Sequence, residues 1–425
     1  MEYCLRCCYP ANTRPHLLID DNGICASCRA FENRAIKNED YWNAKKMELK
    51  NILEQYKEKA RKNGSPYDCI IPVSGGKDST YQTYLITQIF KMRPLLVAYN
   101  HGYNSRLGLR NLNNLVNQFG CDLLRYNTNP KTARKLSLFM LSKVGDMTWH
   151  HHSGIFSFPF QTAVRYKVPL VIYGEDGGGY WQGMFNLDDQ VEFTQKHRQE
   201  IAMRGFEPDD ILNDPENKEI TKADLAPFYF PSNEEIETIG VRGIYISNYD
   251  VWNQVNHAEL MIKEYGFQTY QTSEQTFNLH SSIDDLFEGT HNYLKYLKFG
   301  YSRCTDHASM EIRNQRMSRE EGIEMIKKYE YLKRPKNLDL FLKFAGITEK
   351  EFIDKIEHLR DPKIWEKDQK GEWRQLDWVG NHIWDKGVED ARLPLKEKWR
   401  FITSKPYQDP PINYSYGEDE EIISM

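Results

Sequence analysis

The chain has 425 residues, of which 40% are hydrophobic and 28% charged, and its formal net charge is −5. This composition is typical of a globular protein with two or three domains, and the acidic balance disfavours a nucleic-acid partner, which needs clustered Lys and Arg. The sequence has no apolar run of the roughly 20 residues that cross a membrane, and its start, MEYCLRCCYP, lacks the profile of a signal peptide. We therefore expect a cytoplasmic protein without disulfides.

The first 35 residues predict a zinc-binding knuckle. They are rich in turns and carry two Cys-x2-Cys pairs separated by 17 residues: Cys4, Cys7, Cys25 and Cys28. This spacing is typical of a site with four thiolate ligands, and such a site is structural because no coordination position stays open. Zn²⁺ would supply the cross-link that the few apolar residues of this segment cannot. Cys8 competes with Cys7 as a ligand, and free reduced cysteines are the alternative.

A charged helix at 37–62 comes next, and strand and helix patterns then alternate. Strands are expected at 69–73, 95–99, 121–126 and 169–173, and helices at 79–91, 107–119, 132–144 and 155–166. Such alternation indicates an α/β fold with a parallel sheet covered by helices.

Beyond residue 185 the pattern is mainly helical. Helices are expected at 255–266, 287–300, 318–332 and 348–359, and the last two begin with capping boxes, Ser318 with Glu321 and Thr348 with Glu351. The final 60 residues, ending in the acidic run 417–421, are interpreted as a peripheral wrap or tail. The predicted regions are the knuckle at 1–35, a linking helix at 36–64, the α/β core at 65–185, a helical substrate-binding region at 186–345 and a C-terminal extension at 346–425.

The hexapeptide SGGKDS lies where a parallel sheet binds phosphate, after the first strand and at the start of a helix. Its glycines allow close approach of an anion, and the helix N-terminus offers backbone N–H groups and a positive dipole end. The residues expected to bind ATP and pyrophosphate are Ser74, Gly75, Gly76, Lys77 and Ser79. Asp78 would repel phosphate, so we expect it to hold Mg²⁺. The pattern is not GxxxxGK[ST], which disfavours a kinase or GTPase; a Gly-Gly turn in an unrelated α/β protein is the alternative.

Polar residues follow two further strands. Asn100 and His101 end the second strand, where such sheets contact the nucleotide. Glu175 and Asp176 follow the fourth strand beside a run of glycines and suit Mg²⁺ or substrate binding. An exposed acidic turn is the alternative for this pair.

The loop SGGKDS resembles the PP-loop of N-type ATP pyrophosphatases, which cleave ATP between the α- and β-phosphates. Over roughly residues 3–335 the chain resembles the N-acetyl sugar amidotransferases of lipopolysaccharide (O-antigen) and nonulosonic-acid biosynthesis. Besides the loop, the resemblance rests on DDNGICASCRAFE with the cysteine pairs, LGLRNLNNLVNQFGCD, GDMTWHHHSGIFSFPFQTAVRYKVPLVIYGED and YLKYLKFGYSRCTDHASMEIRNQRMSREEGIEMIKKYE. The chain departs from the family at Cys8, at Cys304 and at GGGYWQG after Asp176.

The resemblance implies a PP-loop core of the adenine nucleotide alpha hydrolase type and an ATP-dependent amidotransferase. In this reaction the oxygen of an N-acetyl group attacks the α-phosphorus of ATP, and ammonia then replaces AMP to give an acetamidino group. The implied substrate is a sugar or sugar nucleotide, in particular a nucleotide-linked diacetamido uronic acid. Lys77, Asp78 and Ser79 would be catalytic with Mg²⁺, and ammonia would come from a glutaminase subunit through a cyclase-like barrel partner.

Two further groups are candidates for substrate binding. Trp149, His150 and His152 belong to the block GDMTWHHHSGI, and neighbouring side chains there point in different directions, which disfavours a metal tract. A second group lies in KFGYSRCTDHASMEIR, where cationic side chains suit a carboxylate or diphosphate: Lys298, Arg303 and Asp306. Core histidines and structural salt bridges are the alternatives.

A tRNA-modifying ligase of the PP-loop class, carrying out thiolation or amidation, is the main competing function. It would need a basic RNA-binding face and catalytic cysteines, whereas the chain is acidic and Cys69, Cys121 and Cys304 stand alone. A subunit that only binds nucleotide is disfavoured by the presence of both Lys77 and Asp78.

Overall fold

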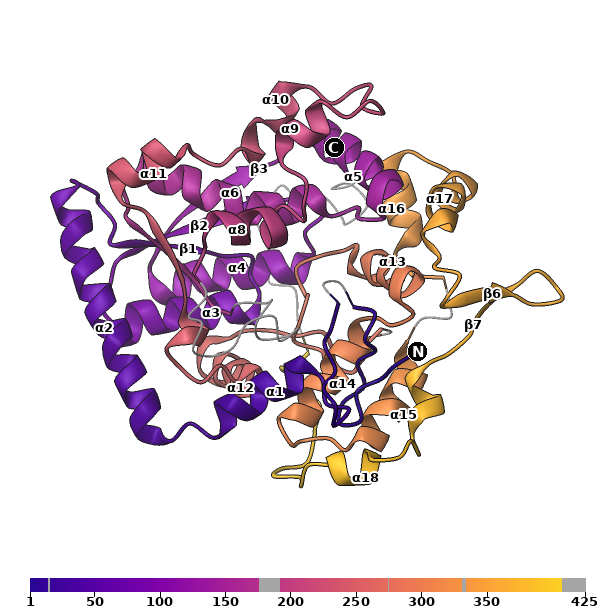
Figure 1. Cartoon of the computed structure of the whole chain (residues 1–425). Helices are drawn as coiled ribbons and strands as arrows, with labels where there is room; N and C mark the ends of the chain where they lie inside the picture. The colour runs from indigo at the N-terminus through magenta and orange to yellow at the C-terminus, as the bar shows by residue number, and fades with distance from the viewer. Residues whose placement is uncertain (14–15, 176–191, 274, 331–333, 407–425) are drawn as a thin grey trace.

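The computed structural model describes residues 1–13, 16–175, 192–273, 275–330 and 334–406. Its centre is a parallel sheet of five strands in the order β3-β2-β1-β4-β5 (Figure 1). The strands are β1 (Cys69–Pro72), β2 (Pro94–Asn100), β3 (Asp122–Asn127), β4 (Leu170–Tyr173) and β5 (Arg242–Tyr245). The predicted α/β class with a parallel sheet is therefore confirmed.

The order of the strands follows from their composition. β1, β2 and β4 are short apolar runs that are buried almost throughout, as expected for central strands covered on both faces. β3 is more polar and partly exposed, which suits its place at the edge. The chain order reverses at β1, so the carboxyl ends of β1 and β4 flank the topological switch point, where open sheets bind ligands.

Helices cover both faces of the sheet. On one face, α2 (Glu39–Lys62), α3 (Lys77–Tyr84) with a π-helical turn (Leu85–Ile89), and α4 (Arg106–Phe119) enclose a core with β1 and β2. On the other face, α5 (Pro130–Val144) and α6 (Trp149–Arg165) pack with Ile70, Val97 and Val171.

Three elements differ from the sequence-based expectation. α6 begins at Trp149, six residues earlier than predicted, and contains Pro159 in its interior. Gly154 explains why this helix packs so closely on β2, because a Cβ there would collide with the ring of Tyr99. β5 was not predicted, and a short helix, α1 (Ala26–Ala35), lies within the segment expected to consist of turns.

The remaining part is mainly helical, as predicted. Before β5 lie α8 (Gln195–His197), α9 (Pro208–Leu212), α10 (Lys222–Leu225) and α11 (Asn233–Ile239). After β5 come α12 (Gln254–Tyr265), α13 (Glu288–Phe299), α14 (Arg303–Arg313), α15 (Arg319–Tyr329), α16 (Leu338–Ala345) and α17 (Glu349–Ile356). The predicted capping boxes at Ser318 and Thr348 both form. None of the described helices combines the length and apolar character needed to cross a membrane.

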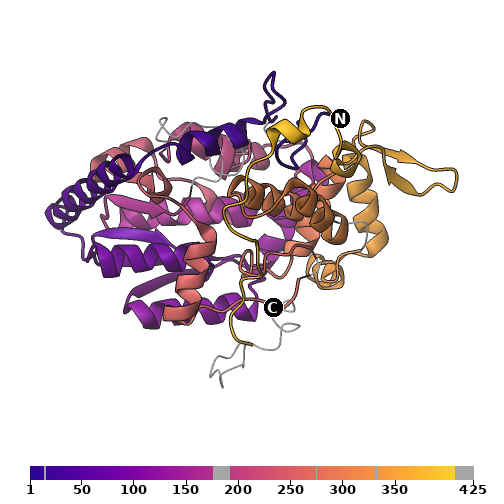
Figure 2. The same ribbon diagram turned by 90° about the horizontal axis from the view of Figure 1, so that it is seen from below.

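The described residues after α17 lie along the outside of the helical region. A hairpin of β6 (Trp365–Lys367) and β7 (Trp373–Gln375) projects from the body (Figure 1). After α18 (Val388–Ala391) the chain crosses the helices in an extended path (Figure 2), and Trp399 N–H bonds to the carbonyl of Arg316. The interpretation of the final 60 residues as a peripheral wrap or tail stays a prediction, and the acidic run at 417–421 lies outside the described residues. The division into five regions stays a prediction.

Candidate functional site

The SGGKDS loop connects β1 to α3 at the switch point. Gly76 is the N-cap of α3, and Gly75 has φ +93°, a conformation that side chains rarely adopt. A Cβ on Gly75 would also collide with the carbonyl oxygen of Gly108 in α4. The loop therefore fits tightly between β1 and α4, with the N-terminus of α3 at the carboxyl edge of the sheet, as anion binding requires.

The charged residues of the loop form a close pair. Lys77 is buried, and its Nζ lies 2.6 Å from Oδ2 of Asp78. Oδ1 of Asp78 is buried and has no hydrogen-bond partner within the described part of the chain. The Ser79 hydroxyl donates to the carbonyl of Gly76 at 3.1 Å. Asp78 thus retains one carboxylate oxygen for a further ligand, which suits a divalent cation.

Asp284 is a site residue that the sequence analysis missed. Its backbone carbonyl accepts a hydrogen bond from Ser105 N–H at 3.0 Å, its Cα packs against Gly108 of α4, and its carboxylate lies close to the Ser74 hydroxyl. Burial raises the pKa of Asp284, and the Ser74 hydroxyl and the charge of Lys77 partly oppose this rise. The loop that carries Asp284 therefore forms one wall of the candidate site, about 200 residues beyond SGGKDS in the sequence.

Three buried histidines lie near enough to Lys77 for its charge to act on them. Burial lowers the pKa of His257 to about 3, and it lowers the pKa values of His280 and His307 well below the usual range. The charge of Lys77 adds to the lowering at all three. His257 stacks on Tyr81 with ring centroids 3.5 Å apart. Since these imidazoles are neutral near pH 7, Lys77 supplies the positive charge among these four residues.

A second group of imidazoles lies beyond Asp284. We call it the histidine cluster: His101, His151, His152 and His291. The rings of His101 and His151 are 3.9 Å apart, and those of His152 and His291 are 6.3 Å apart. Burial lowers the pKa values of all four, to about 4 for His151 and His291, so the cluster is neutral near pH 7.

Ion pairs lie beside the histidine cluster. Arg204 pairs with Asp146, and Nε of Arg303 lies 3.3 Å from Glu288. The structure also brings together two predicted residues, because Nη1 of Arg303 lies 3.4 Å from Asp306. Asp306 pairs in addition with Lys295 at 2.5 Å and accepts a hydrogen bond from the Tyr9 hydroxyl at 3.0 Å.

Two other predicted substrate-binding residues, Trp149 and His150, are completely buried. The indole N–H of Trp149 donates to the carbonyls of Met203 and Phe206. Nε2 of His150 lies 3.4 Å from the hydroxyl of Tyr103. These contacts position the first turn of α6. Within that turn, the structure places His151, which the sequence analysis passed over, against His101.

Asn100, Glu175 and Lys298, three further predicted site residues, each form a hydrogen bond within the described structure. Asn100 donates to Asn127 at 2.6 Å, which joins the ends of β2 and β3. Glu175 follows β4 and accepts a hydrogen bond from Gln254 at 2.8 Å. Lys298 donates to the carbonyl of Gly145 at 3.0 Å, at the end of α5. Asp176 lies outside the described residues. The binding roles of all the predicted site residues stay predictions.

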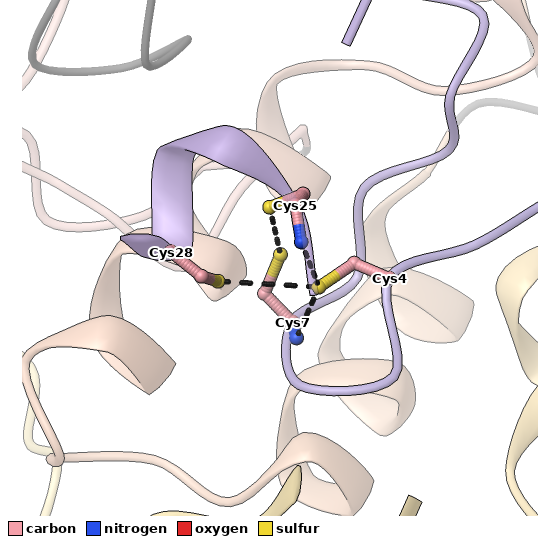
Figure 3. A group of neighbouring side chains, drawn as sticks. All are labelled: Cys4, Cys7, Cys25 and Cys28. Atoms are coloured by element: carbon pink, nitrogen blue, oxygen red, sulfur yellow. Dashed lines mark hydrogen bonds between the residues drawn. The ribbon is translucent and has the colours of Figure 1, made fainter. Parts of the chain in front are cut away.

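The four predicted zinc ligands converge (Figure 3). The sulfurs of Cys4, Cys7, Cys25 and Cys28 all lie within 4.8 Å of one another and are buried, with Cys4 to Cys28 at 4.0 Å and Cys7 to Cys25 at 3.6 Å. Tetrahedral zinc with Zn–S bonds of about 2.3 Å separates its sulfurs by about 3.8 Å, so the group fits this ion. Cys8 lies outside the group, and its backbone N–H donates to Ser309. The first pair is therefore Cys4 and Cys7.

The cysteine group is joined to the helices of the site. Arg313 of α14 is buried and donates to the sulfur of Cys7 at 3.7 Å, which offsets thiolate charge. Arg319 of α15 donates to the carbonyl of Cys7 at 3.2 Å. Because α14 also carries Arg303, Asp306 and His307, the N-terminal segment fixes one wall of the site.

Three comparisons with known proteins bear on this arrangement. Residues 264–379 match the family model for the C-terminal domain of WbpG-like LPS biosynthesis proteins. An uncharacterized protein of Methanocaldococcus jannaschii, MJ1599, is 28% identical over 124 residues, which are 29% of this chain and 42% of that protein. The structure of NMN synthetase from Francisella tularensis aligns with 46% of this chain and 92% of its own, with 14% identity and a TM-score of 0.24. The segment similar to the WbpG-like domain contributes Asp284, Glu288, Arg303 and Asp306 to the site.

Proposed function

We propose that the chain is an ATP-dependent carbon–nitrogen ligase of lipopolysaccharide biosynthesis that converts an N-acetyl group of a sugar into an acetamidino group. The proposal rests on one observation: two segments far apart in the sequence form two walls of the same candidate site. The SGGKDS loop forms the first wall, and Asp284, from the segment similar to the WbpG-like domain, contacts it through Ser74. A phosphate-binding loop next to a sugar-pathway segment suits a ligase that activates a sugar group with ATP.

The first step would take place at the phosphate loop. The N–H groups at the start of α3 and the charge of Lys77 would neutralise the phosphates of ATP while the amide oxygen of the sugar attacks the α-phosphorus. Asp78 and Asp284 are suited to hold Mg²⁺, which would neutralise further charge on the leaving pyrophosphate. The product would be an adenylated imidate, whose carbon is far more electrophilic than that of the amide.

The second step needs ammonia and the exclusion of water. Ammonia attacks the imidate carbon and AMP leaves, whereas water would regenerate the amide and waste ATP. Ammonium ion cannot attack, so we propose that a glutaminase subunit and a cyclase-like barrel partner deliver neutral ammonia. The sugar would lie against the histidine cluster, with Arg303 near the carboxylate of a nucleotide-linked diacetamido uronic acid.

Zinc would have a structural role. Bound by Cys4, Cys7, Cys25 and Cys28, it would hold the N-terminal segment against α14 and so fix the position of Arg303 and Asp306. Reduced cysteines and the use of ATP suit a cytoplasmic enzyme.

The test is incubation of the purified chain with acetamido sugars, ATP, Mg²⁺ and ammonium, followed by mass spectrometry. We expect a product one mass unit lighter, because NH replaces O, together with AMP and pyrophosphate. Lys77→Ala should abolish this product while the fold persists, and Lys350→Ala, at an exposed lysine in the first turn of α17, is the matched control. Undiminished AMP formation by Lys77→Ala would contradict the proposal.

A further inference from the structure

A narrow cavity lies between α12, α14 and the extended segment that follows α18, and we call it the His280 cavity. Its outer part lies beneath residues 398–402, where Lys398 and Arg400 are exposed. Its inner part is lined by Gln254 of α12 and by His307 and Met310 of α14. The two parts adjoin, because they share five lining residues: Val255, Asn278, His280, Glu311 and Arg316.

The inner part borders the candidate site. His280 and His307 both lie near enough to Lys77 of the phosphate loop for its charge to act on their rings. The side chain of Gln254 donates a hydrogen bond at 2.8 Å to Glu175, which follows β4. The His280 cavity therefore extends from the exposed C-terminal segment to the surroundings of Lys77.

His280 is the residue that points to a ligand. It is 4% exposed, and neither of its ring nitrogens has a hydrogen-bond partner among the residues that the structure describes. A neutral imidazole donates one hydrogen bond and accepts another, and buried polar atoms are almost always satisfied. The ring therefore suits a small molecule that can both donate and accept hydrogen bonds.

The size of the cavity limits what can bind there. For the centre of a water-sized molecule the volume is about 20 Å³ in the outer part and about 10 Å³ in the inner part. One water molecule needs about 10 to 15 Å³ by this measure. The cavity thus holds one or two molecules of the size of water or ammonia, whereas a sugar or a nucleotide does not fit.

The charges around His280 favour a neutral occupant. Burial lowers the pKa of His280 well below the usual range, and the charges of Lys77, His307 and Arg316 add to the lowering. The same positive potential disfavours an ammonium ion beside the ring. Glu311 lies 2.6 Å from Nε of Arg316, so its carboxylate charge is already paired.

We propose that the His280 cavity binds neutral ammonia on its way to the phosphate loop, and that His280 holds it there by hydrogen bonds. This inference rests on the proposed function. Ammonia passes unchanged, so no bond forms or breaks before it attacks the imidate carbon. A route too narrow for ATP or the sugar lets ammonia arrive while those substrates occupy the site.

The test separates the use of ammonium from adenylation in two variants. Val255→Phe fills the cavity from α12, and His280→Leu removes both ring nitrogens. Adenylation is measured as exchange of labelled pyrophosphate into ATP with the acetamido sugar and without ammonium, and its rate should stay within about twofold in both variants. The kcat/KM of amidine formation for ammonium should fall at least about tenfold in Val255→Phe and about fivefold in His280→Leu, the effect of one hydrogen bond.

Val251→Phe is the control, because it adds the same bulk at an exposed position just before α12 and should change neither rate. A kcat/KM for ammonium within about twofold of the unaltered chain in either folded variant would overturn the inference, as would an equal loss of exchange and amidine formation in folded His280→Leu. Circular dichroism checks the fold, and if Val255→Phe is unfolded, His280→Leu decides alone. If the unaltered chain shows neither exchange nor amidine with any acetamido sugar, the proposed function itself has failed.

Discussion

Gly75 is the residue of the SGGKDS loop at which a side chain would be least tolerated. Its φ of +93° strains any L-residue, and a Cβ would collide with the backbone of Gly108. The second effect cannot be relieved by rotating a side chain, because both colliding parts are fixed, one in the loop and the other in α4. The shape of the SGGKDS loop is therefore tied to the packing of α3 and α4.

Gly75→Ala should cost more than backbone strain alone. Gly64 offers a matched control, because it has φ +72° but nothing within 4 Å of an added Cβ. We expect Gly64→Ala to lower the free energy of unfolding by about 1 kcal/mol, the usual cost of such strain. Gly75→Ala should lower it by at least about 3 kcal/mol and abolish ATP binding. Urea unfolding measures the free energy of unfolding of both variants, and an equal decrease in the two variants would contradict the account.

Glu330 predicts a dependence of stability on pH. Oε1 accepts hydrogen bonds from the backbone N–H and the hydroxyl of Thr305 at 2.8 and 2.7 Å, while Oε2 is buried without a partner in the described structure. Burial raises the pKa of Glu330 from 4.5 to about 7. Because the folded state holds the proton more tightly than the unfolded state, this group contributes stability below about pH 4.5 that is lost as the pH rises to about 7.

Glu330→Gln should remove this loss. Between pH 5 and 8, the free energy of unfolding of the unaltered chain should fall by about 2 to 3 kcal/mol more than that of the variant. Urea unfolding at both pH values measures the difference, and other titrating groups affect both proteins alike. Parallel pH profiles would show that Glu330 is ionised normally in the folded state.

At the scale of elements, the N-terminal segment depends on its four cysteines. It has little apolar surface of its own, yet it packs on α14 and α15 through Cys8, Tyr9 and the buried Arg313 and Arg319. A metal cross-link would hold the turns that carry these contacts. Loss of the metal should therefore affect the candidate site through α14 and not only the N-terminus.

Cys28→Ser and Cys8→Ser separate the ligand group from its neighbour. Elemental analysis should give about one zinc per chain for the unaltered protein and for Cys8→Ser, and much less for Cys28→Ser, because a hydroxyl is a poor zinc ligand. Cys28→Ser should also lose amidine formation as α14 moves. A chain without zinc, or equal zinc loss in both variants, would contradict the structural zinc site.

The elements that the sequence predicted well are those with local signals. Apolar runs identified β1, β2 and β4, the alternation of strands with helices indicated β3, and capping boxes identified the starts of α15 and α17. β5 was missed because RGIY is short and begins with Arg and Gly. The first turn of α6 was missed because three histidines give no apolar period; what holds it is burial of Trp149 against residues more than 50 positions away.

At the scale of the whole molecule, the site is assembled from distant segments. The phosphate loop, the end of β2, the start of α6, and the loop and helices from Asp284 to Arg313 meet at the carboxyl edge of the sheet. The sequence could indicate the phosphate loop and the cysteine ligands, since each is a compact motif. It could not indicate Asp284 and Asp285, because their place depends on long-range pairing such as the bridge between Asn104 and Asp285.

The central claim is that the phosphate loop directs the amide oxygen of a sugar to the α-phosphorus of ATP. An acetamido sugar labelled with oxygen-18 in its amide tests this directly, with ATP, Mg²⁺ and ammonium, by mass spectrometry of the nucleotide. The account predicts one labelled oxygen in AMP for every amidine formed and none in pyrophosphate. Unlabelled AMP beside a labelled sugar, or label released only into water, would contradict it.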